Sequence, residues 1–407
     1  MNTFYWQVEM INRDFMSNFQ SDRVGRISSP PARQWLFPLL VVAGVVLFAK
    51  WVIAPSDSGH LEMSLWLGVS FGALLQRSRF CFYCVSRDFF ERRDAAGLLG
   101  IVAALAVGLV GYHFIFGAFL PMPRADRLPP GAHIGPISWV LVVGAFTFGI
   151  GMSLARSCVS ALFYRLGEGM ATAPIGLLGV IVGFALGFAS WNTLYLQAIQ
   201  SAPVIWLPHY LGYEGALWLQ LVVLAAVALV LAWRHQIMPA SNTTLWWRKR
   251  WPTWAGGLLI GALAALAYLR VGPFGVTAEI GSLARTGADA FGWLPARLEG
   301  LDTFRGCATV IKETLWSNNG LFVIGVTLGA VASALSAGDA VFKKPSFKEL
   351  TRTFAGGVLM GWGAMVALGC TVGTLLSGIM ASALSGWVFA VFCMAGLYLG
   401  WRVQYRK

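Results

Sequence analysis

The sequence predicts an all-α integral membrane protein of about nine or ten transmembrane helices, with short re-entrant helices and an inverted internal repeat. Three observations support this fold class. Hydrophobic residues make up 57% of the 407 residues, charged residues make up only 12%, and the 18 tryptophans exceed what a soluble domain of this size carries. Apolar runs of membrane-spanning length recur along the chain. A glycine-patterned apolar segment that ends in a cysteine occurs twice.

Six apolar runs are long enough to cross a bilayer as one helix, which takes about 20 residues. In chain order they are Trp35–Pro55, Ala95–Leu120, Thr172–Ser190, Ala216–Trp233, Thr253–Arg270 and Ala383–Trp401. Four further runs are short or interrupted by glycine: Met63–Leu75, Ile137–Ala155, Gly320–Ala337 and Phe354–Leu368. Interrupted spans are tolerated at membrane depth only where they are buried in protein or line a cavity, so these runs predict broken or re-entrant helices.

The repeated segment comprises Gly144–Cys158 and Gly356–Cys370. Aligned without a gap at an offset of 212 residues (370 − 158), the two copies share three glycines, one alanine and the final cysteine. Such duplication is typical of transporters whose substrate site lies between the repeats. Leu67–Ala73 also resembles Ile324–Ala330, at another offset. These two segments are expected to cross the membrane in the same direction.

Lysine and arginine cluster before the first run, in two loops and at the end of the sequence. Because cytoplasmic loops carry the excess of these residues, ten spans with both ends inside place all four clusters in the cytoplasm. An odd number of spans then separates Cys158 on the inner side from Cys370 on the outer side. Val276–Pro295 is expected to be an amphipathic piece at the outer surface. The predicted organisation is a cytoplasmic tail (1–34), a first transmembrane half (35–233), a basic cytoplasmic linker (234–252) and a second transmembrane half (253–407).

Several functions are not expected from this composition. Loops account for most of the net charge of +12, and the basic residues form no single patch, which argues against nucleic-acid binding. The sequence has no phosphate-binding loop for ATP, and its five histidines lack metal-ligand spacing, so neither a cofactor nor a metal is predicted. Arg77, Arg79 and Arg156 instead lie beside cysteines at span ends, where an arginine either reaches toward the surface or serves an anion path.

The six cysteines have different surroundings. Cys393 lies in the last apolar run without polar neighbours and is expected to pack. Cys307 lies in a predicted outer loop without an obvious partner. Cys81 and Cys84 form a C-x-x-C pair, which alone is compatible with a redox pair or half of a metal site. The two cysteines that end the repeated segments are candidates for function because the repeat places a thiol at the same point twice.

Three spaced motifs carry a family resemblance. They are Arg77-Ser78-Arg79-Phe80-Cys81-Phe82 followed by Ser86-Arg87-Asp88, Gly149–Cys158 followed by Tyr164-Arg165 and Glu168-Gly169, and Gly361-Trp362-Gly363-Ala364 followed by Ala367-Leu368-Gly369-Cys370. Together they cover most of residues 60–400, and they resemble the YeeE/YedE family of bacterial sulfur-compound transporters, whose characterised members take up thiosulfate. Two features depart from the family pattern. Arg156-Ser157 replaces the usual Gly-Gly before the cysteine, and the half with the first motif is expected to come first instead of second, as in a circular permutation.

The resemblance implies a multi-pass protein of the bacterial inner membrane that takes up thiosulfate or a related small sulfur anion and is not an enzyme. Family members carry three functional cysteines in the places where this chain has Cys81, Cys158 and Cys370. The candidate residues of the transport path are Cys81, Cys158, Cys370, Arg77, Arg156, Gly369 and Thr371. Besides the anion and the lipid bilayer, a cytoplasmic sulfur-carrier protein is a candidate partner.

These residue types suit a sulfur dianion. A helix that begins after Gly369-Cys370 directs the N–H groups of Thr371 to Gly373, and the hydroxyls of Thr371 and Thr374, at an anion. Neutral thiols add weak donors and a polarizable surface for a soft sulfur atom, and several weak sites in series permit release. Two alternatives stay open: a membrane thiol or persulfide redox enzyme, and a transporter of a selenium compound.

Overall fold

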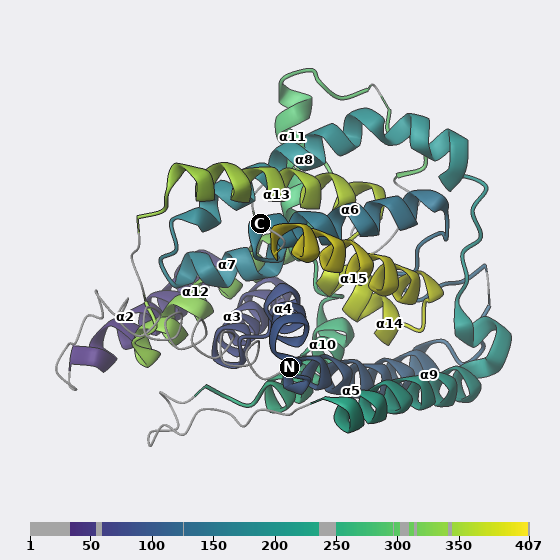
Figure 1. Ribbon diagram of the computed structural model, residues 1–407, viewed down its shortest axis with the longest axis horizontal. Helices are drawn as coiled ribbons and strands as arrows, with labels where there is room; N and C mark the ends of the chain where they lie inside the picture. The colour runs from purple at the N-terminus through teal and green to yellow at the C-terminus, as the bar shows by residue number, and fades with distance from the viewer. Residues whose placement is uncertain are drawn as a thin grey trace, which may run out of the picture.

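The computed structural model describes residues 33–53, 59–124, 126–235, 250–295, 297–301, 309–312, 316–340 and 344–405. Within these residues the chain is helical, with isolated β-bridges only (Figure 1). The α-helices are α2 (Arg33–Phe48), α3 (His60–Ser78), α4 (Phe82–Arg92), α5 (Ala96–Phe119), α6 (Trp139–Ala155), α7 (Val159–Gly167), α8 (Thr172–Leu194), α9 (Leu207–Arg234), α10 (Thr253–Arg270), α11 (Val276–Ala290), α12 (Asn318–Ala337), α13 (Phe347–Val366), α14 (Gly378–Met380) and α15 (Leu384–Tyr405). The π-helices are η1 (Ala49–Ile53), η3 (Tyr195–Ile199) and η5 (Thr371–Ser377).

The described helices confirm an all-α integral membrane protein. Seven spans are long and apolar enough to cross a membrane, and α13 with the bent continuation η5–α14 makes an eighth. Both α3 and the shorter α2 pack against α12, one of the seven. With these two, each of the ten apolar runs in the sequence corresponds to one long helix. Most of the predicted tail, most of the predicted linker and Cys307 lie outside the described residues.

The long helices pack in parallel pairs, with one member from each predicted half. The pairs are α3 with α12, α5 with α10, α6 with α15, and α8 with α13, the last of which lie side by side in Figure 1. In the first pair, Gly68 faces Phe322 and Gly72 faces Val326, so both helices run in the same direction. The two similar segments of α3 and α12 are therefore in direct contact, and their predicted common orientation is confirmed.

The two copies of the repeated segment, in contrast, pack in opposite directions. Gly144 of α6 lies against Gly363 of α13, and Ala155 lies against Gly356. The cysteine-bearing ends consequently lie at opposite ends of the α6–α13 contact, as an inverted repeat requires. From Gly144 to Ala155 the contact follows α6 for 11 residues (155 − 144), which is about 16 Å of helix.

Glycine is what allows these backbones to approach each other. A Cβ atom added at Gly183 of α8 would lie 2.1 Å from the carbonyl oxygen of Val358, and one at Gly361 of α13 would lie 2.1 Å from that of Val180. Hydrophobic burial does not drive association between helices inside a bilayer, so close packing of small residues supplies much of the attraction. The glycine pattern in the sequence is therefore a pattern of helix contacts.

The predicted amphipathic surface segment is corrected by the structure. Its helical part is α11, which is largely buried and packs against α8 and α12. One charged residue of α11 has its partner within the protein: Glu279 is 5% exposed and forms an ion pair with Lys312. An amphipathic pattern does not distinguish a helix at the membrane surface from one that faces a polar interior.

Candidate functional site

The three candidate cysteines occupy the same position in three copies of one turn. In each copy a long helix ends at a residue with a positive φ angle, two residues before the cysteine. These angles are 51° at Arg79, 53° at Arg156 and 56° at Leu368. Each cysteine is extended and precedes a short helix as its N-cap: Cys81 before α4, Cys158 before α7 and Cys370 before η5. The turn thus places each thiol at the positive end of a helix.

Cys81 and Cys158 are in contact. Both side chains are completely buried, and their Sγ atoms lie 3.8 Å apart. The hydroxyl of Ser160 lies 3.3 Å from the Cys158 sulfur. Cys84, one turn along α4, also interacts with the Cys81 thiol, but the described cysteines are all free thiols. The N-termini of α4 and α7 therefore meet at a point that holds two thiols and a hydroxyl.

Cys370 lies at the opposite end of the α6–α13 contact. Its thiol is buried, accepts a hydrogen bond from the Gly373 N–H at 3.5 Å and interacts with Thr277 at the start of α11. Among the residues that the structure describes, no hydrogen bond joins it to Cys81 or Cys158. The N-termini of α11 and η5 thus also meet, with Thr277, the second residue of α11, beside the thiol of the N-cap Cys370.

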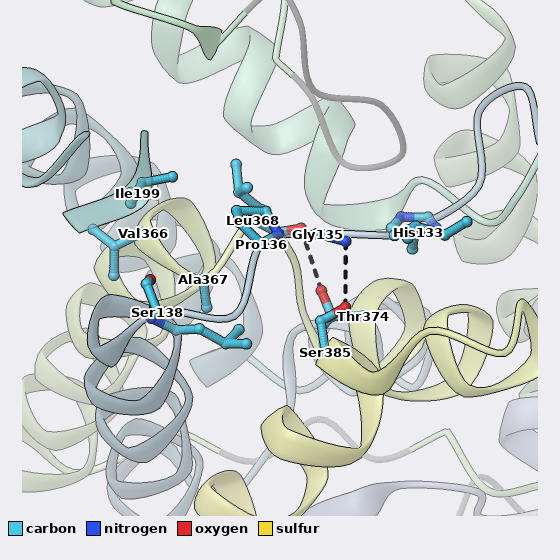
Figure 2. A pocket seen from close by; sticks show the side chains of 12 residues that line it. His133, Gly135, Pro136, Ser138, Ile199, Val366, Ala367, Leu368, Thr374 and Ser385 are labelled. Carbon is cyan, nitrogen blue, oxygen red and sulfur yellow. Dashed lines mark hydrogen bonds between the residues drawn. The ribbon is translucent and has the colours of Figure 1, made fainter. Parts of the chain in front are cut away.

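The residues around Cys370 are fixed by close packing. Gly369 has a φ angle of 151°, and an added Cβ would lie 2.1 Å from Thr374 Oγ1, so only glycine fits there. The expectation that the Thr374 hydroxyl points at an anion is not met, because it donates to the carbonyl of Leu368 at 3.2 Å (Figure 2). Thr371 is buried at the first position of η5.

A cavity of about 20 Å³ lies beside this turn. Figure 2 shows its lining, in which the Gly135 N–H donates to Ser385 Oγ at 3.3 Å. Burial lowers the pKa of His133, which also lines the cavity, to about 4, so this side chain is neutral at pH 7. The volume holds about one water molecule, so the cavity does not admit a larger anion in this conformation.

Arg79 belongs to an ion cluster. Its guanidinium lies 3.3 Å from the carboxylate of Glu168 and 3.7 Å from that of Asp339, and Gln76 donates to both carboxylates. Burial raises the pKa of Glu168, and the charge of Arg79 opposes that rise. The cluster joins the ends of α3, α7 and α12. Because two carboxylates balance its charge, Arg79 contributes little positive potential to the nearby thiols.

The other two predicted arginines lie in different places. Arg77 donates to Ser336 at 2.9 Å, which ties α3 to α12. Arg156 is exposed and lines a cavity of about 370 Å³. A third arginine, Arg165, was not predicted as a site residue, yet it donates to Cys84 Sγ at 3.4 Å.

Sequence reasoning also missed Ser160 and Thr277. Ser160 follows the predicted Cys158 by two residues, but only the fold of the turn shows that its hydroxyl reaches the thiol. Thr277 lies in the segment that was assigned to the surface. The Gly272-Pro273-Phe274-Gly275 break before it was a usable signal, because it separates α10 from a short helix in the same way as the cysteine turns.

The sequence matches the family described as sulphur transport over residues 77–399, which is more than half of the chain. The chain belongs to the sulphur transport family. It is therefore a multi-pass membrane transporter and not a redox enzyme. The match also includes all three cysteine turns.

Relatives in this family include named transporters. The thiosulfate transporter TsuA of Spirochaeta thermophila is 28% identical over 347 residues, which is 82% of this chain and 95% of the relative. TsuA of Escherichia coli is 24% identical over 358 residues, 83% of this chain and 93% of the relative. The probable transporter YedE of Salmonella typhimurium is 24% identical over 213 residues, 52% of this chain and 50% of the relative. One alignment spans nearly all of each TsuA, so the halves come in the same order and the expected circular permutation is wrong.

Proposed function

We propose that this chain takes up thiosulfate, or a related small sulfur-containing anion, across the bacterial inner membrane along a path lined by Cys81, Cys158 and Cys370. The observation that carries the proposal is the contact between Cys81 and Cys158. Two buried thiols from different helices lie 3.8 Å apart where two helix N-termini meet. The thiosulfate transporters among the relatives support the choice of substrate.

The electrostatics of the pair suit transient binding. Each helix N-terminus is equivalent to about half a positive elementary charge. Two such ends attract a dianion without holding it as tightly as paired arginines would. Neutral thiols donate weak hydrogen bonds and present polarizable sulfur to the soft terminal sulfur of thiosulfate. Weak binding at each step is what allows the anion to leave.

Cys370 lies at the other end of the proposed path from Cys81 and Cys158. Cys370 and Thr277 meet at the N-termini of η5 and α11, and the α6–α13 contact between the two positions is about 16 Å long. An anion therefore visits the two positions in sequence. The distribution of lysine and arginine places Cys370 toward the outside and Cys158 toward the cytoplasm.

The proposed organisation follows from the same distribution. The tail (1–34) and the basic linker (234–252) lie in the cytoplasm and flank the first transmembrane half (35–233), and the second half (253–407) completes the path. The parallel helix pairs support this division because each pair joins the two halves. A cytoplasmic sulfur-carrier protein that receives the anion stays a predicted partner.

Growth and uptake test the proposal. A sulfur-auxotrophic host with this chain should grow on thiosulfate as sole sulfur source and take up radiolabelled thiosulfate, and the host without it should not. Cys81→Ala, Cys158→Ala and Cys370→Ala should each abolish uptake at matched membrane expression, since steps in series fail together, whereas Cys393→Ala should not. Near wild-type uptake in the first three variants would contradict the cysteine path. A selenium compound that displaced thiosulfate at lower concentration would favour the selenium alternative.

A further inference from the structure

A basic cavity next to the Cys81–Cys158 pair includes Arg156 of the candidate path residues but none of the three path cysteines. Its volume is about 370 Å³, and it lies between α4, the turn after α6, α7 and the starts of α8 and α13. Its charged lining residues are Arg87, Arg156, Arg165, Arg352 and Glu349. Arg156 and Glu349 are exposed, so the cavity opens at the protein surface.

Two of these charges are already engaged locally. Arg87 forms an ion pair with Asp88 at 2.6 Å. Glu349 accepts a hydrogen bond from the Ser346 N–H at 3.0 Å as part of the capping box that begins α13. Arg87 is therefore balanced locally, whereas Glu349, the acidic group of the lining, also interacts favourably with Arg352.

The other three arginines contact neutral groups. Within the described part of the chain, no carboxylate lies within 4.0 Å of the guanidinium of Arg156, Arg165 or Arg352. Arg165 donates to the Arg156 carbonyl at 2.8 Å and to Cys84, and Arg352 donates to the Leu154 carbonyl at 2.9 Å. The guanidinium groups of Arg156 and Arg352 also repel each other. An anion between them would remove that repulsion.

Helix ends add to the positive potential. α8 and α13 run in parallel, and their first residues, near Thr172 and Pro345, line the same cavity. The partial positive charge at the start of a long helix favours an oxyanion nearby, although the Glu349 N–H donates to Ser346, the Ala173 N–H donates to Met170 and Pro174 has no N–H. Three guanidinium groups that have no carboxylate within 4.0 Å among the described residues therefore line one open cavity beside the starts of two helices.

We propose that this cavity is a second anion site, which binds small divalent oxyanions such as sulfate and thiosulfate through their oxygen atoms. Guanidinium and backbone N–H groups recognise charge and oxygen, which the two anions share, whereas a thiol can also recognise the terminal sulfur. The cavity gathers oxyanions without discriminating between them, and the thiols discriminate.

The site is placed to exchange anions with the thiol pair. Arg165 links the cavity to Cys84 at 3.4 Å, Cys84 interacts with Cys81, and Cys81 lies 3.8 Å from Cys158. The inference deepens the proposed transport function, on which this connection rests. Binding to the cavity itself can be measured without transport.

Equilibrium binding of radiolabelled sulfate to the purified full-length protein tests the proposal. We expect saturable binding that weakens as the KCl concentration rises and that unlabelled thiosulfate displaces with similar affinity. Arg156→Gln and Arg352→Gln should each weaken binding about tenfold or more, because each removes a charge-assisted hydrogen bond. Arg402→Gln is the matched control, since it removes an exposed arginine of α15 outside the cavity.

Two further measurements distinguish binding in the cavity from transport and from lipid binding. Cys158→Ser protein should bind sulfate like the wild type even though it is expected not to transport, so loss of uptake alone does not count against the site. Protein in nanodiscs of phosphatidylcholine or of phosphatidylglycerol should bind sulfate equally. Absence of saturable binding, equal binding by the arginine variants and the control, or displacement of sulfate by phosphatidylglycerol would each overturn the proposal.

Discussion

Replacing Cys158 by serine should abolish uptake without destabilising the protein. Cys158 is the N-cap of α7, and its side chain makes no standard capping hydrogen bond. Serine is among the preferred N-cap residues and cysteine is not. The substitution therefore removes the thiol from the proposed path while it improves the local helix start, which separates a transport role from a packing role.

The magnitudes can be worked out from the surroundings of the thiol. A serine N-cap stabilises a helix by about 0.5–2 kcal/mol over a residue that does not cap. The smaller oxygen leaves some space in a completely buried site, at a cost below about 1.5 kcal/mol for a near-isosteric change. The hydroxyl keeps Ser160 as a hydrogen-bond partner. The free energy of unfolding should therefore stay within about 1 kcal/mol of the wild type.

Radiolabelled thiosulfate uptake at matched expression and thermal unfolding in detergent measure the two effects. Cys393→Ser is the control, because it buries a hydroxyl within α15, where no helix start benefits. That variant should lose stability and retain uptake, the reverse of Cys158→Ser. Wild-type uptake by Cys158→Ser would refute the reasoning and reduce Cys158 to a packing residue.

Three other predictions follow from the same features. Cys84→Ala should retain most uptake, because the proposed path needs Cys81 but not the thiol one turn further on; a loss as complete as that of Cys81→Ala would indicate a joint role. Gly183→Ala should lower the thermal unfolding temperature through a cost of about 1–3 kcal/mol, whereas Gly117→Ala, with nothing within 4 Å, should not; equal unfolding temperatures would contradict the backbone contact. When transport opens the buried thiols, a membrane-impermeant thiol reagent should reach Cys370 only from outside and Cys158 only from inside, and labelling of both from one side would exclude the inverted orientation.

The long helices could be located from the sequence because lipid imposes a simple rule on them. The run Thr253–Arg270 coincides with α10, since its ends are set by proline on one side and a charged residue on the other. α9 begins at Leu207, nine residues before the predicted run at Ala216 (216 − 207), but Gly212, with a φ angle of 70°, breaks the helix close to the predicted start. Hydropathy measures burial in lipid, and it does not register a helix that extends beyond it.

The site was less predictable because it depends on contacts between distant segments. Cys81 and Cys158 were both candidates, but they lie 77 residues apart in the sequence, and only the packed turns show that their thiols touch. The role of Thr277 was missed because polar residues in α11 suggested a surface helix. Buried polar groups need partners, as Glu279 has in Lys312. The sequence alone does not show which residues form such pairs.

The glycine contacts bear on how an anion could cross. Many transporters alternate access by rocking one repeat against the other. Here the repeats meet through helices such as α8 and α13, whose backbones come so close that a methyl group at Gly183 or Gly361 would collide with a carbonyl. Sliding or rotation of either helix would bring side chains into the same positions. The long helices should therefore act as a fixed frame, and the motion that lets an anion pass should come from the short helices and the positive-φ turns that carry the thiols.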